Sequence, residues 1–86
     1  MYKIVFSRKA VKDVICLSKS PFYEKFIKLL RIIQKDPFQK PPLFKPLIGC
    51  DCFARRLNIQ HRLVYRVNTL SNTIEICSCW GHYEDK

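Results

Sequence analysis

The spacing of apolar residues changes once along this chain, at a proline-rich segment that spans residues 37–46. Before that segment, apolar residues recur every three or four positions, which is the spacing of one face of an α-helix. After it they alternate with polar residues, which is the spacing of one face of a β-strand. Helices followed by a meander of strands predict an α+β fold, with two N-terminal helices packed on one face of an antiparallel sheet.

The boundaries of these elements follow from the local residues. Ser7 is placed to cap the first helix, and Ser20-Pro21 to begin the second as N-cap and first helical residue. The second helix should end at Asp36, because a residue before proline disfavours helical ψ. We expect a sheet of about four strands whose other face is free, with the proline-rich segment as a stiff loop outside it. The predicted strands span residues 2–6, 53–58, 61–67 and 73–80.

The size and charge of the chain limit the classes of function that it can have. Its 86 residues predict a single domain, 1–86, and 48% hydrophobic residues are enough for a core. Sixteen Lys and Arg against seven Asp and Glu leave a net charge of +9, which favours a polyanionic partner. The most apolar stretch, 26–33, is interrupted by two cations and is far shorter than the roughly 20 residues of a membrane span. No secretory signal is visible, so we expect a cytoplasmic protein without membrane contact.

The cysteines suggest one alternative function. Cys50-x-Cys52 and Cys77-x-Cys79 could supply four thiolates to a zinc ion. The usual zinc spacing is wider, however, and alternate residues of a strand point to one face simply by packing. Five cysteines also do not fit a closed set of disulfides. We therefore expect reduced thiols and no metal or other cofactor.

A group of arginines marks a candidate anion-binding surface. Arg62 and Arg66 project to the same face of the 61–67 strand, and Arg55 and Arg56 lie on the neighbouring strand, one on each face. Guanidinium groups match phosphate oxygens in pairs and stay charged at any working pH. The same residues would also serve as a solvated polar face, and the pattern alone favours neither reading.

His82 and Tyr83 follow the last predicted strand. A histidine exchanges protons near neutral pH, and a tyrosine can bond a phosphate or stack on a base, although such a pair is often only surface decoration. RNA cleavage by its own 2′-OH needs an acid, a base and cations, but no metal. His61, which opens a strand beside a turn, is expected to be structural and to bond backbone.

Two segments resemble a known family. Residues 55–65, RRLNIQHRLVY, and residues 79–83, CWGHY, resemble the YoeB/Txe toxins of the RelE superfamily. The resemblance implies a microbial-ribonuclease-like fold and the activity of a ribosome-dependent mRNA interferase, the toxin of a type II toxin–antitoxin pair. It also implies mRNA in the ribosomal A site and ribosomal RNA as partners, an acidic antitoxin of the Phd/YefM type, and a homodimer.

The family pattern also assigns roles to residues. Arg62 would neutralise the scissile phosphate, His82 would act as general acid, and Tyr83 would place the phosphate and base. Arg55, Arg56 and Arg66 would support contact with RNA.

Lys45 departs from the family pattern. It occupies the position, two residues before Leu47, where the family has a glutamate as general base. A lysine is normally charged at pH 7 and then cannot accept a proton. Three outcomes are open: neighbouring arginines keep Lys45 neutral, water replaces the base while His82 takes a second role, or the protein binds antitoxin, ribosomal RNA or both without cleavage.

Overall fold

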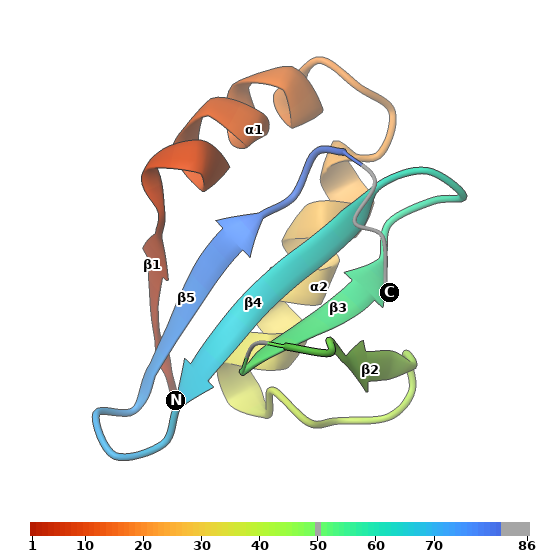
Figure 1. Cartoon of the computed structure of the whole chain (residues 1–86). Helices are drawn as coiled ribbons and strands as arrows, with labels where there is room; N and C mark the ends of the chain where they lie inside the picture. Colours follow the sequence, from red (N-terminus) through yellow and green to blue (C-terminus); the bar gives the residue numbers. More distant parts are fainter. Residues whose placement is uncertain (50, 82–86) are drawn as a thin grey trace.

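The computed structural model describes residues 1–49 and 51–81, and this part of the chain forms two helices and a five-stranded sheet (Figure 1). The strand order is β1-β5-β4-β3-β2. The elements are β1 (Lys3–Phe6), α1 (Arg8–Ser18), α2 (Tyr23–Lys35), β2 (Phe44–Pro46), β3 (Cys52–Arg56), β4 (Arg62–Asn68) and β5 (Thr73–Ser78). The predicted α+β class and the meander of the last three strands are confirmed.

The sheet differs from the expected one in two strands. First, β1 pairs with β5 in parallel, so the sheet is mixed rather than antiparallel. No hairpin links these two strands, because both helices and three strands lie between them in the chain, and antiparallel pairing is therefore not imposed. Second, part of the proline-rich segment forms β2, which pairs with β3 at the sheet edge. An edge strand tolerates Pro46 because only one of its sides needs ladder hydrogen bonds.

The helix boundaries agree with the sequence except at one end. The Ser7 side chain accepts a hydrogen bond from the Ala10 N–H at 3.0 Å and caps α1 as predicted. Helix α2 ends before Asp36, also as predicted, but it begins at Tyr23 without a side-chain cap. The Ser20 hydroxyl instead donates to the Leu17 carbonyl and accepts from the Phe22 N–H. Ser20 thus closes the turn between the helices rather than capping the second one.

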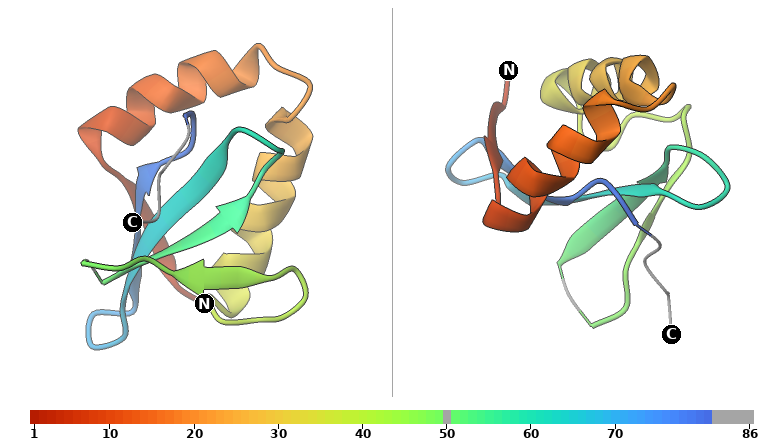
Figure 2. Two further views of the ribbon diagram at one scale, coloured as in Figure 1. Left: turned by 45° about the vertical axis from the view of Figure 1, so that its right-hand side comes forward. Right: turned by 90° about the horizontal axis from the view of Figure 1, so that it is seen from above.

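The main core lies between the helices and one face of the sheet, as expected (Figure 2). It contains fully buried residues from both helices and from the central strands, among them Ala10, Leu17, Phe26, Ile33, Leu63, Tyr65, Ile74 and Ile76. No helix in the described part of the chain is long and apolar enough to cross a membrane.

The opposite face of the sheet is not free. Leu47, which follows β2, packs there with Cys52 and Ala54 of β3 and Val64 of β4. The side chain of Leu47 is 5% exposed and that of Val64 is 2% exposed, so this face has a small core of its own. Cationic residues of the same strands lie around this cluster, and they form the candidate site.

Candidate functional site

A cavity of about 650 Å³ opens beside the edge strand β2. Four cations line it, from α2, β2, β3 and β4, together with apolar residues of the proline-rich segment and of the sheet. Its lining residues are Lys25, Leu29, Pro42, Leu43, Phe44, Lys45, Ala54, Arg56 and Arg62. A cationic hollow with an apolar wall can take an anionic group that carries an aromatic base.

Strand register explains why three of the predicted residues converge at this cavity. Lys45 lies opposite Ala54 in the β2–β3 pair, and Arg56 lies opposite Arg62 in the β3–β4 pair. Residues directly opposite each other point to the same face of a sheet, and so do alternate residues of one strand. Lys45, Arg56 and Arg62 therefore share the face that the helices do not cover.

Arg62 is held in place by the turn that precedes it. Its Nη1 donates to the carbonyls of Asn58, His61 and Ile59 at 2.9, 3.3 and 3.4 Å. The Asn58 side chain in turn accepts from the N–H groups of Gln60 and His61, which fixes the turn. A guanidinium has five N–H donors on three nitrogens, so one anchored nitrogen leaves the other two to meet a bound phosphate. The side chain is thus oriented before any ligand binds.

Arg55 and Arg56 lie on opposite faces of β3, as predicted, and only Arg56 lines the cavity; Arg55 lies on the other side of the sheet. Its side chain lies on the helix face and is 1% exposed. Its guanidinium donates to the Tyr65 hydroxyl at 3.0 Å and to the carbonyls of Pro37, Gln39 and Pro42. Because these partners occupy it inside the core, we assign Arg55 a structural role instead of RNA contact.

The Arg55–Tyr65 pair determines where the proline-rich segment lies. The Tyr65 hydroxyl donates to the Pro37 carbonyl at 2.8 Å, and burial raises the pKa of that hydroxyl, so it remains a donor. The guanidinium of Arg55 also lies over the Phe44 ring, 4.8 Å from its centroid. The pair therefore fixes both ends of the loop that leads into β2 and Lys45.

Arg66 lies on the same face as Arg62 but outside the cavity. It is four residues further along β4, where its Nη1 lies 3.3 Å from Oε1 of Glu75. Its Nη2 lies 3.8 Å from the Cys52 sulfur, and half of the side chain is exposed. Arg66 is therefore not among the residues that line the cavity.

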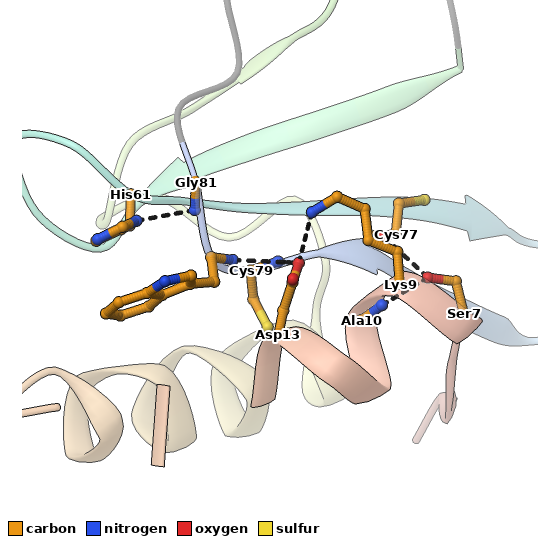
Figure 3. Close-up of polar contacts among 9 residues, drawn as sticks. Ser7, Lys9, Ala10, Asp13, His61, Cys77, Cys79 and Gly81 are labelled. Atoms are coloured by element: carbon orange, nitrogen blue, oxygen red, sulfur yellow. Dashed lines mark hydrogen bonds and ion pairs between the residues drawn. The ribbon is translucent and has the colours of Figure 1, made fainter. Parts of the chain in front are cut away.

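His82 and Tyr83 lie outside the described residues, and the segment directly before them is held from two sides (Figure 3). The Asp13 carboxylate accepts from the backbone N–H groups of Cys79 and Trp80 at 3.1 and 3.4 Å. His61 accepts from the Gly81 N–H through Nδ1 at 2.8 Å. The backbone contact of His61 is thus confirmed, whereas sequence reasoning overlooked Asp13. A signal was present, because Asp13 interrupts the buried face of α1 between Ala10 and Leu17.

The four-thiolate zinc site is contradicted by the positions of its cysteines. Cys79 lies beyond the end of β5 and is fully buried in the main core, whereas Cys77 packs against the cluster on the other face. The two thiols therefore cannot converge on one ion. Within residues 1–49 and 51–81, no three His, Cys, Asp or Glu side chains gather as metal ligands.

Several solved structures of bacterial toxins are similar to this one. The YoeB/ParE toxin of Agrobacterium tumefaciens superposes with a TM-score of 0.85 at 28% identity, over 94% of this chain and 99% of that chain. YoeB of Staphylococcus aureus in complex with YefM gives 0.79 at 30% identity, over 96% and 99%, and a YoeB dimer from the same organism gives 0.81. The Escherichia coli RelBE toxin–antitoxin complex gives 0.74 at 27% identity, over 98% and 99%.

Sequence comparison leads to the same group of proteins. No protein of curated function matches the chain. The model of a family described as YoeB-like toxins of bacterial type II toxin–antitoxin systems matches residues 6–83, which is nearly the whole chain. This protein therefore belongs to the YoeB-like toxin family.

Proposed function

We propose that this protein is a ribosome-dependent endoribonuclease that cleaves mRNA by attack of a 2′-OH on the adjacent phosphate. The observation that carries the proposal is the convergence of Lys45, Arg56 and Arg62 at one cavity. Arg62 also directly follows His61, whose imidazole binds the Gly81 N–H, and His82 follows Gly81 in the chain. This short link favours an arrangement in which Arg62 and His82 reach one phosphodiester.

Each residue then has a chemical task. Arg62 and Arg56 stabilise the charge that grows on the phosphorus oxygens, and a positioned donor of this kind typically contributes about 10²–10³-fold in rate. His82 protonates the departing 5′-oxygen, and Tyr83 positions the phosphate and base. Arg66, exposed and outside the cavity, contributes to contact with ribosomal RNA. No step requires a metal ion or another cofactor.

Lys45 adds positive charge to the cavity but does not serve as a general base. Water then takes the proton of the 2′-OH, and cleavage is slower than with a carboxylate at this position. A positioned general base typically contributes about 10²–10⁴-fold. The lysine at position 45 also favours a second candidate function, in which the protein binds antitoxin, ribosomal RNA or both without cleaving mRNA.

Substitution at Lys45 separates the two candidates. In a cell-free translation reaction with mapped mRNA ends, Lys45→Glu should raise the cleavage rate about tenfold or more. The matched control is Lys25→Glu, which makes the same charge change in the same cavity from α2 and should not raise the rate. His82→Ala should abolish cleavage in both backgrounds. If the wild type and Lys45→Glu both bind ribosomes without cutting mRNA, the binding function replaces the nuclease.

The partners of the relatives suggest partners for this chain. Solved structures show YoeB of S. aureus in complex with YefM and as a dimer. A body with a net charge of +9 suits an acidic antitoxin of the Phd/YefM type, and we propose that it acts in the cytoplasm, where translating ribosomes are found. A short acidic reading frame beside this gene, whose product co-purifies with the protein, would support the pairing. The molar mass of the purified toxin in solution tests whether it forms a homodimer.

A further inference from the structure

We propose that Asp13 and His61 are positioning residues: they clamp residues 79–81 and thereby fix the point from which the chain continues to the proposed catalytic residues His82 and Tyr83. The inference rests on the proposed function, because it assigns to the clamp the placement of the general acid. The clamp joins three parts of the chain that are distant in sequence: α1, the turn before β4, and the segment after β5 (Figure 3).

The Asp13 side of the clamp is a buried carboxylate directed at backbone. Asp13 is 9% exposed, and its Oδ2 accepts from Cys79 N, Trp80 N and the Lys9 ammonium, the last at 2.8 Å. Burial of a carboxylate is costly unless it is paired and hydrogen-bonded. Here the compensating donors include two successive amides just past the end of β5 at Ser78. Charge-assisted bonds of this kind are stronger than neutral ones.

The His61 side combines a hydrogen bond with ring stacking. Nδ1 accepts from the Gly81 N–H, so in the neutral imidazole the proton lies on Nε2. The ring stacks on Trp80 with centroids 3.8 Å apart and planes inclined by 15°. His61 is 7% exposed, and its own carbonyl accepts from Arg62 Nη1. One residue therefore contacts both the segment that leads to His82 and the arginine of the cavity.

The backbone at Gly81 adds a directional constraint. Its φ is +128°, a conformation that residues with a Cβ rarely adopt, although a Cβ there would meet no atom within 4 Å. Glycine is therefore required for the direction of the chain and not for space. Three successive amides with side-chain acceptors, the last of them the amide of this glycine, fix the path of the chain immediately before His82.

Two variants of His61 separate the hydrogen bond from the stacking. His61→Asn keeps an acceptor near the position of Nδ1 but removes the ring, whereas His61→Phe keeps a ring against Trp80 but removes the acceptor. On the Asp13 side of the clamp, Asp13→Asn keeps an oxygen that can accept from the backbone N–H groups, whereas Asp13→Ala removes the acceptor. Thermal unfolding of every variant identifies any that fail to fold, and only folded variants are compared.

The first readout is the hydrogen exchange of single amides by NMR, which does not depend on cleavage. His61→Phe should speed exchange at Gly81 at least tenfold, while Ile74 in the core keeps its protection, and His61→Asn should leave Gly81 near the wild-type value. Unchanged protection of Gly81 in folded His61→Phe would overturn the clamp. This result stands whether or not the protein cuts RNA, so failure of the clamp and failure of the nuclease are distinguishable.

The second readout is single-turnover cleavage on translating ribosomes over a range of toxin concentrations. We expect His61→Phe to lower the maximal rate by about 10- to 100-fold, the usual effect of misplacing a catalytic group by roughly 1 Å. The toxin concentration for half-maximal rate should change less than threefold, and His61→Asn should restore most of the rate. If folded His61→Phe kept the wild-type maximal rate, or changed only the toxin concentration for half-maximal rate, the positioning role would be refuted. Asp13 and His61 would then have a structural role only.

Discussion

Replacement of Arg55 by methionine is the most direct test of how the proline-rich segment is held. The side chain is 1% exposed, and its guanidinium donates to four acceptors, which are the Tyr65 hydroxyl and the carbonyls of Pro37, Gln39 and Pro42. Methionine fills a similar volume and removes every one of these bonds. The Pro37 carbonyl keeps the Tyr65 hydroxyl as a donor, whereas the carbonyls of Gln39 and Pro42 lose the Arg55 donor.

The expected cost follows from these contacts. A hydrogen bond to a charged group contributes about 1.5–3 kcal/mol, and an unsatisfied buried acceptor costs about 1–3 kcal/mol. Two factors reduce the total: the charge no longer has to be desolvated, and the two carbonyls can regain water if the loop opens. We therefore expect Arg55→Met to lower the free energy of unfolding by about 3 kcal/mol. Arg55→Lys, which keeps the charge without the planar fork, should cost about 2 kcal/mol.

Urea denaturation followed by circular dichroism measures these costs. The matched control is Arg56→Met, at the adjacent residue on the other face of β3, where the side chain is exposed. Such a surface change usually lies within about 0.5 kcal/mol of the wild type. The structural assignment of Arg55 would be refuted if Arg55→Met cost less than about 1 kcal/mol, the scale of one net hydrogen bond, or no more than Arg56→Met.

Three further predictions follow from single contacts. Arg62→Ala should lower single-turnover cleavage about 10²-fold or more, whereas Arg66→Ala, outside the cavity, should not, and equal losses would contradict the site geometry. Ser7→Ala should destabilise the protein by about 1–2 kcal/mol in urea, because Ser7 caps α1 and also donates to a β5 carbonyl; no change would argue against the cap. Burial raises the pKa of the Cys79 thiol from 9.0 to about 12, so the folded state holds this proton more tightly. Stability should therefore fall as pH rises from 9 toward 12, less steeply in Cys79→Ala, and alkylation at pH 8 should modify exposed Cys16 before Cys79.

Periodicity predicted most of the fold because it reports which side of each element is buried. The change from helical to alternating spacing located both helices and the meander, and the cap at Ser7 and the stop at Asp36 depend on neighbouring residues alone. The pairing of β1 with β5 and of β2 with β3 joins segments through geometry that no local pattern encodes. Those two strands were accordingly the part that sequence reasoning misjudged.

The sequence also predicted part of the candidate site. Alternation along β3 and β4 correctly placed Arg55 and Arg56 on opposite faces of the sheet, and Arg62 and Arg66 on one face. It could not tell which of the two adjacent arginines would lie under the helices, because the acceptors of Arg55 are carbonyls from a loop more than a dozen residues away. The position of Asp13 on the buried face of α1 was a visible signal, but its partners follow β5 at the other end of the chain, so the local sequence did not show what it contacts.

The central claim is tested most directly by the chemistry of the cleaved ends. A message with one 2′-deoxynucleotide at the mapped cleavage position is translated beside its all-ribose counterpart in the presence of the toxin. Attack by the 2′-OH predicts that only the all-ribose message is cut, and that its fragments carry a 2′,3′-cyclic phosphate and a 5′-hydroxyl. Cleavage of the deoxy-substituted message at the same position, or fragments with a 5′-phosphate, would contradict the mechanism.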